Sequence, residues 1–271
     1  MIEEQVIQRT AEWTIWWLGE RQKKLREHMS ETMSVNPFLL PIIYDLHSLS
    51  EIEELFELTI GSHLMTGHNT GFGKLIDEKI LPNVFNTTKL DARFRRETTP
   101  YSLSCFDEID HIVYRTSGDI DLLSLKAGKW TIQLSMAVQL NKAFSEILER
   151  FPGEYNQISV GVFYGKKEGL TDKYDILRGI NRGKNHDVVN LQEHVNVYAG
   201  REFWAWLNDG ELLTQDWVLS GIRKGLKDSG SREESKELLD AFKQEIVDNY
   251  GKYIKTDGDI DWEQLLIDVN G

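Results

Sequence analysis

The strongest constraint on the fold is a strand pair followed by a helix and two more strands. EIDHIVYRT (108–116) and IDLLSLKA (120–127) have β-rich composition and flank a Ser-Gly-Asp turn signal. Residues 131–151 place apolar side chains on one helical stripe, and residues 158–165 and 195–200 have the pattern of buried strands. Because strands and a helix alternate in this way, the sequence predicts an α/β core with a mixed sheet flanked by helices.

Helical patterns dominate both ends of the chain. Residues 2–30 follow a 3.6-residue period, and residues 48–60 begin after a serine with acidic residues in the first turn. Pro82 is expected to stop a further helix at 72–81. The tail divides into the segment EFWAWL (202–207), an expected helix around 217–226 and an expected acidic helix at 232–250, with the best linker candidate at 227–235. The predicted organisation is therefore a helical part (1–62), an α/β core (63–208) and a second helical part (209–271).

The charge of −13 is concentrated at the two ends. Residues 1–57 and 232–271 each carry 5 Lys/Arg and 11 Asp/Glu, so the centre is close to neutral. This distribution argues against nonspecific coating of DNA but permits a local basic cleft. The single Cys105 excludes an internal disulfide, and no signal peptide or membrane span is recognisable, so we expect a cytoplasmic protein without a membrane.

The strand pair carries the candidate chemistry. Asp110 lies on the first strand, and Ser124 and Lys126 fall on one face of the second, because side chains alternate along a strand. The turn would fold the carboxylate back beside the hydroxyl and the ammonium. The Asp110 carboxylate and the Leu125 carbonyl suit a hard cation such as Mg²⁺, and Lys126 suits the orientation of an attacking water. This set predicts phosphodiester hydrolysis, although an exposed ion pair is the ordinary alternative for an isolated Asp and Lys.

The pattern Asp-x13-Ser-x-Lys resembles the PD-(D/E)xK nucleases, and longer segments resemble the type II restriction endonucleases that recognise RGGNCCY. The similarity covers essentially the whole chain. Its most specific segments are SETMSVNPF (30–38), HLMTGHNTGFGKLIDEKILP (63–82), CFDEIDH (105–111), LLSLKAGKWTIQLSMAVQLNKAF (122–144), GLTDKYDILRGINRGKNH (169–186) and VYAGREFWAWLN (197–208).

The resemblance implies a Mg²⁺-dependent homodimer with a helical dimerisation region, formed from the chain ends, that cuts double-stranded DNA at a GGNCC-type site. A cognate DNA methyltransferase would protect that site in the host. It implies Asp110 as a metal ligand and Lys126 as the residue that activates water. Two positions depart from the motif: Ile109 replaces Pro, and Ser124 replaces an acid. We expect Glu78, on the preceding helix, to supply the missing carboxylate, ahead of Asp107 or Asp121.

A local basic segment at 166–186 is the predicted DNA-binding region, with a net charge of +3. Arginine paired with guanine in a GG/CC site contributes about 1–3 kcal/mol of discrimination for each bidentate contact. A solvated basic loop is the alternative. The candidate DNA-binding residues are Lys166, Lys173, Arg178, Asn181, Arg182, Lys184, Asn185 and His186. A second, weaker candidate for phosphate binding comprises Arg93, Arg95 and Arg96.

Two other motifs do not predict a site. The histidines show no metal-ligand spacing, and GHNTGFGK (67–74) lacks the spacing of a phosphate-binding loop, so ATP use is not indicated. Two alternative functions stay open. Because Ser124 replaces an acid, the chain could be a catalytically inactive DNA-binding protein of the nuclease fold, or else a helical scaffold held by its acidic ends.

Overall fold

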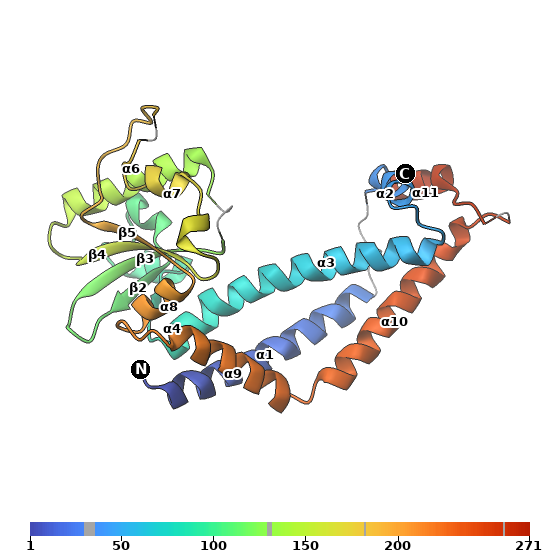
Figure 1. The fold of residues 1–271 in the computed structure, drawn as a ribbon, viewed down its shortest axis with the longest axis horizontal. Coiled ribbons are helices and arrows are strands. Elements are labelled where there is room, and N and C mark those ends of the chain that lie inside the picture. The colour runs from blue at the N-terminus through green and yellow to red at the C-terminus, as the bar shows by residue number, and fades with distance from the viewer. Residues whose placement is uncertain (30–35, 129–131, 182, 257) are drawn as a thin grey trace. The chain divides into compact units, whose positions relative to one another are not determined.

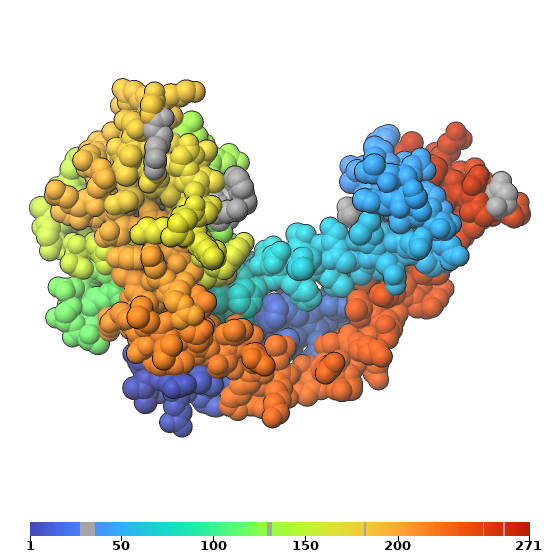
Figure 2. Space-filling model, viewed as in Figure 1, coloured from blue at the N-terminus to red at the C-terminus, as the bar shows by residue number. Residues whose placement is uncertain are grey.

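The computed structural model describes residues 1–29, 36–128, 132–181, 183–256 and 258–271 (Figures 1 and 2). These residues form two compact units. Unit 1 comprises residues 1–13 and 73–225, and unit 2 comprises residues 14–72 and 226–271.

Unit 1 is built on a five-stranded sheet in which neighbouring strands follow the order β1-β2-β3-β4-β5. β1 pairs antiparallel with β2, and β2 with β3, whereas β3, β4 and β5 run parallel. The prediction of an α/β fold with a mixed sheet is thus confirmed. The strands are β1 (Thr88–Lys89), β2 (His111–Tyr114), β3 (Ile120–Lys126), β4 (Gln157–Val162) and β5 (Val195–Ala199).

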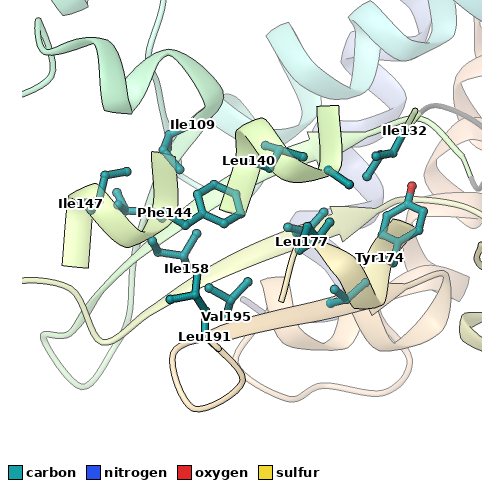
Figure 3. Close-up of a cluster of buried hydrophobic side chains, with 14 of the residues drawn as sticks. Ile109, Ile132, Leu140, Phe144, Ile147, Ile158, Tyr174, Leu177, Leu191 and Val195 are labelled. Carbon is teal, nitrogen blue, oxygen red and sulfur yellow. The ribbon is translucent and has the colours of Figure 1, made fainter. Parts of the chain in front are cut away.

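Helix α6 (Leu134–Arg150) covers one face of the sheet, because its apolar stripe repeats at helical spacing. Leu140, Phe144 and Ile147 are fully buried there against Ile158 of β4 (Figure 3). Short α7 (Lys173–Ile176) completes this core. The segment expected as a helix at 131–151 is therefore confirmed from residue 134, and residue 131 lies outside the described residues.

Helix α8 (Arg201–Leu207) packs on the opposite face. Gly161 of β4 makes this close packing possible, because a Cβ at that position would lie 2.4 Å from the ring of Phe203. The ring of Phe85, at the end of α4, lies 5.9 Å from that of Trp204. The remaining elements of unit 1 are η1 (Ile76–Ile80), α4 (Leu81–Val84), α5 (Ala92–Glu97), η2 (Ser104–Glu108), η3 (Lys167–Gly169) and α9 (Thr214–Asp228).

Unit 2 is helical. Its core is formed by buried residues that include Leu55, Phe56, Tyr250 and Leu265. α1 (Glu3–Met29) and α3 (Ile52–Leu75) contribute residues to both units. The other elements are α2 (Leu39–Leu46), α10 (Arg232–Tyr250), η4 (Gly251–Tyr253) and α11 (Trp262–Asn270).

The observed division differs from the expected boundaries at 62/63 and 208/209. The expected boundary at 62/63 falls inside α3, where a change of composition cannot reveal the point at which a continuous helix passes from one core to another. The expected boundary at 208/209 falls in the turn between α8 and α9. The linker candidate at 227–235 is largely helical, since α9 ends at Asp228 and α10 begins at Arg232.

The prediction that Pro82 stops a helix is wrong, because the helical run continues to Val84. A wider π-turn (η1) precedes the proline, and the Leu81 N–H donates to the Ile76 carbonyl five residues earlier. A wide turn leaves room for a proline ring that an ordinary α-helical turn would exclude. The separate helices expected at 48–60 and 72–81 are therefore one helical run from residue 52 to residue 84.

Candidate active site

Asp110 lies directly before β2 and is held against β3 through its backbone and its side chain. Its N–H donates to the Leu123 carbonyl at 2.8 Å, and its Oδ2 accepts the Leu125 N–H at 2.6 Å. The register pairs His111 with Leu123, so one residue further along the same ladder Asp110 lies opposite Ser124. Since side chains alternate along β3, Lys126 shares the face of Ser124. The strand pair therefore places the carboxylate and the ammonium on one face.

The electrostatics of Asp110 reflect both its burial and its neighbours. Burial is the largest influence and raises the pKa of the carboxyl above its ordinary value of 3.8. The charge of Lys126 and the hydrogen bond from Leu125 act in the opposite direction, and the negative charge of Asp77 raises the pKa further. The net pKa is raised, so ionising this carboxyl costs stability in the folded protein.

This cost predicts that Asp110→Asn is more stable than the wild type at neutral pH. A carboxyl whose pKa is raised in the folded state destabilises that state once the pH exceeds the unfolded pKa, here 3.8. The gain in the free energy of unfolding should be present at neutral pH and should vanish as the pH falls below about 3.8. Chemical denaturation of both proteins between about pH 3 and pH 8 measures it. An asparagine variant that is less stable at neutral pH would contradict the prediction.

Ser124 occupies the position where the resembled nucleases carry an acid. It is fully buried in β3, and its Oγ has no hydrogen-bond partner among the described residues. A short side chain there leaves Asp110 as the sole carboxylate from the strand pair on this face. A buried hydroxyl without a partner is uncommon and costs stability, so packing alone does not explain the serine.

Ser124→Glu is expected to strengthen Mg²⁺ binding. The longer side chain extends along the face shared with Asp110 and Lys126 and adds a carboxylate ligand, which should lower the dissociation constant for Mg²⁺ roughly tenfold. Ser124→Gln is the matched control, since it has the same length without the charge. Calorimetric titration with Mg²⁺ measures the difference. Equal affinity of the glutamate and glutamine variants would show that residue 124 does not approach the cation.

The acid that η1 brings toward Asp110 is Asp77, and the predicted Glu78 is exposed. The Oδ1 of Asp77 lies 2.8 Å from Nε2 of His111, and its Oδ2 pairs with Nζ of Lys89. His111 is fully buried, and its Nδ1 lies 3.0 Å from the Thr87 hydroxyl. The pKa of Asp77 is lowered, because the hydrogen bonds and charges of His111 and Lys89 outweigh its desolvation. Asp77 therefore remains charged beside the candidate site.

Glu78 follows Asp77 in the same π-helical turn and has an exposed side chain, and its role as a metal ligand stays a prediction. Thr87, Lys89 and His111 were not among the residues predicted for the site. His111 could have been recognised from its alternation with Ile112 on a predicted strand, because this alternation places the imidazole on the face opposite the core that α6 covers.

The two alternative acids named from the sequence differ in their surroundings. Asp107 is exposed in η2. Asp121 is fully buried at the start of β3, where Oδ2 accepts from Nε of Arg115 at 2.7 Å and from Gln157 at 2.9 Å. Lys126 lies at the other end of the same strand, so Asp121 serves a separate buried network.

The donor set allows a weakly held magnesium ion. No group of three or more His, Cys, Asp or Glu side chains among the described residues is arranged to hold a metal. Mg²⁺, however, commonly takes one or two carboxylates and completes its shell with water and substrate phosphates. Asp110 offers such a carboxylate, and the unpartnered Ser124 Oγ offers a further neutral oxygen. The residues present thus fit a cation whose remaining ligands come from solvent and DNA.

Within the predicted DNA-binding region (166–186), Tyr174, Ile176 and Leu177 are buried in the core, whereas residues 166–169 and 183–185 are exposed. Buried Asn141 of α6 donates from Nδ2 to the Leu177 carbonyl at 3.0 Å and exchanges hydrogen bonds with the Val189 backbone. Gly179 has φ +85°, and a Cβ there would lie 2.0 Å from the Val189 carbonyl. The loop is therefore anchored by specific backbone contacts at both ends.

Several of the predicted DNA-binding side chains already have partners in the fold. Nε of Arg178 donates to the Val195 carbonyl at 2.9 Å, and Lys173 pairs with its neighbour Asp172. The side-chain oxygens of Asn181 and Asn185 accept backbone N–H groups of the same loop. His186 is half-buried and Arg182 lies outside the described residues, while the exposed candidates are Lys166, Asn181, Lys184 and Asn185.

The second predicted phosphate-binding group also contains both exposed arginines and one that is bound within the fold. Arg93 and Arg96 are exposed on α5, and Arg93 pairs with Glu97 one turn later. Arg95 instead turns inward and donates to backbone carbonyls.

Comparison with known proteins identifies no relative. No model of a protein family matches the chain, and no curated protein is significantly similar to it. Within the part of the chain that the structure describes, no helix combines the length and the apolar character that crossing a bilayer requires.

Proposed function

We propose that the protein is a Mg²⁺-dependent DNA endonuclease of the type II restriction class, acting at a GGNCC-type site such as RGGNCCY. The observation that carries the proposal is the β2–β3 register, which brings Asp110 and Lys126 to one face of the sheet. The Asp110 carboxylate also accepts a hydrogen bond from the backbone of β3. A carboxylate and an ammonium in this arrangement are suited to one scissile phosphate.

In this mechanism the Lys126 ammonium orients the attacking water, whose proton passes to solvent as the water oxygen attacks the phosphorus in line with the leaving 3′ oxygen. The P–O3′ bond breaks, leaving a 5′ phosphate and a 3′ hydroxyl that takes its proton from solvent. Bound Mg²⁺ would neutralise charge that develops on the phosphate oxygens. The charge of Lys126 and the Leu125 N–H favour the ionised form of Asp110 against the effect of burial, and the exposed lysines of the 166–186 segment contact the DNA backbone.

Cutting both strands of a pseudo-palindromic site requires two active centres, so we propose that the working form is a homodimer. The host would need a DNA methyltransferase of the same specificity to protect its own sites.

The test is digestion of a sequenced plasmid with the full chain, in Mg²⁺ and in a chelator, followed by mapping of the ends. We expect discrete fragments that begin and end at one GGNCC-type sequence in Mg²⁺ and intact plasmid in the chelator. Asp110→Asn should show no cutting although it is folded. Random degradation, or cutting by the Asp110 variant, would contradict the proposal.

Ser124 favours one second candidate, a DNA-binding protein of the nuclease fold that has lost its activity. In that case the wild type binds duplex DNA but leaves the plasmid intact, whereas Ser124→Glu gains Mg²⁺-dependent cutting. A protein that neither binds nor cuts duplex DNA would exclude both candidates.

A further inference from the structure

We propose that Arg95 is a positioning residue for Asp110. Its guanidinium ties together the three backbone segments that hold the carboxylate in place. The inference rests on the proposed nuclease function and adds to it a residue remote from the phosphate.

Arg95 lies on α5, whose first turn is fixed by Asp91. The Asp91 carboxylate accepts the backbone N–H groups of Arg93 and Phe94, as an N-cap does. The half-buried Arg95 then directs all three of its nitrogens to backbone oxygens. Nε donates to the Leu90 carbonyl at 2.8 Å, Nη1 donates to that of Phe106, and Nη2 donates to that of Ile109.

Each of these carbonyls belongs to a segment in contact with Asp110. Leu90 follows β1, and its N–H donates to the Asp110 carbonyl at 2.8 Å. Ile109 precedes Asp110 in the chain, and its N–H donates to the Phe106 carbonyl at 2.9 Å. The side chains of Leu90, Phe106 and Ile109 are all buried in one core, where Ile109 lies near Phe144 and Ile147 (Figure 3). Arg95 therefore connects the segment that precedes Asp110, through Phe106 and Ile109, with Leu90 at the end of β1.

This arrangement acts through the backbone rather than through charge. The charged side chains that shift the pKa of Asp110 are Lys126, Asp77 and His111. The planar guanidinium supplies donors in a rigid fork, which a lysine ammonium on a flexible stem does not reproduce. Groups behind a metal ligand hold its orientation, and their loss typically costs about 10–100-fold in metal affinity or activity.

The test compares Arg95→Lys and Arg95→Met with Arg150→Met, which removes an exposed arginine at the end of α6 that pairs with Glu146 one turn earlier. Three quantities are measured on the full chain: the Mn²⁺ dissociation constant by calorimetry, the cleavage kcat and KM, and the salt dependence of DNA binding. Circular dichroism selects a temperature at which each variant is folded. If Arg95→Met does not fold, Arg95→Lys, which keeps the charge and most of the bulk, carries the comparison.

We expect both Arg95 variants to bind Mn²⁺ roughly tenfold more weakly and to lose kcat by a similar factor, with KM and the salt slope of DNA binding unchanged. Arg150→Met should leave the Mn²⁺ affinity and kcat unchanged. The inference is overturned if Arg95→Lys keeps the wild-type Mn²⁺ affinity and kcat, or if the Arg95 variants lower the salt slope, as loss of a phosphate contact would. A wild type that binds Mn²⁺ at Asp110 but never cuts DNA would refute the nuclease proposal and leave the positioning role intact.

Discussion

Lys126→Ala is expected to abolish DNA cleavage while specific DNA binding survives. Lys126 shares a face with Asp110, and its charge is the largest influence that favours ionisation of that carboxyl. A positioned donor that orients the water and stabilises developing charge contributes about 10²–10³-fold to a reaction rate, so the loss should be of that order. Cleavage rates under single-turnover conditions and gel-shift affinities for a GGNCC-containing duplex measure the two effects separately.

Two controls sharpen this experiment. Lys126→Met keeps the length of the side chain without the amine and should be as inactive as the alanine variant. Lys23→Ala removes an exposed lysine that pairs with Glu27 one turn later in α1 and should cut at the wild-type rate. Wild-type cleavage by either Lys126 variant would remove the assigned mechanism.

Arg115→Leu is expected to lower the free energy of unfolding by about 3–5 kcal/mol, because it leaves a buried carboxylate without its counter-ion. The Arg115 side chain is 10% exposed and that of Asp121 is 0% exposed. Nη1 of Arg115 also donates to the Trp206 carbonyl at 2.6 Å, and the guanidinium lies 4.3 Å from the centre of the Trp206 ring. Urea denaturation of the full chain measures the change.

The control for this prediction is Arg93→Leu, whose side chain is 79% exposed and pairs with Glu97. A surface pair of this kind contributes about 0.3–0.5 kcal/mol. The double variant Arg115→Leu with Asp121→Leu should recover part of the lost stability, since no charge then remains buried. Recovery should be incomplete, because Asn156 and Gln157 also lose their acceptor on Asp121. A loss below about 1 kcal/mol in Arg115→Leu would contradict the buried-pair interpretation.

The strand pair of the candidate site could be predicted because its geometry is local. A turn around Gly118, whose φ is +92°, joins β2 and β3, and the Arg115 N–H donates to the Asp119 carbonyl across it. Once the turn sets the register, the period of two places Ser124 and Lys126 on the same face. The α6 stripe followed from its helical period in the same way.

The neighbours of Asp110 could not be predicted because they come from distant segments. Asp77 reaches His111 across 34 residues and acts on the charge of Asp110 from there, and no local periodicity predicts this contact. Arg95 and Arg178 are arginines in basic segments, so the sequence alone suggests that they contact phosphates. Only the packed backbone shows that they donate to carbonyl groups.

The sequence by itself therefore determined the α/β class, the mixed sheet and the pairing of Asp110 with Lys126, since each depends on alternation and turns within a few tens of residues. The tertiary structure alone decided which charged groups are buried. It assigned Asp121 to Arg115, Asp77 to Lys89 and His111, and Arg95 to the backbone around Asp110. The physical reason is that a polar group leaves water only where partners from other segments meet its hydrogen bonds, and those partners are brought together by the fold.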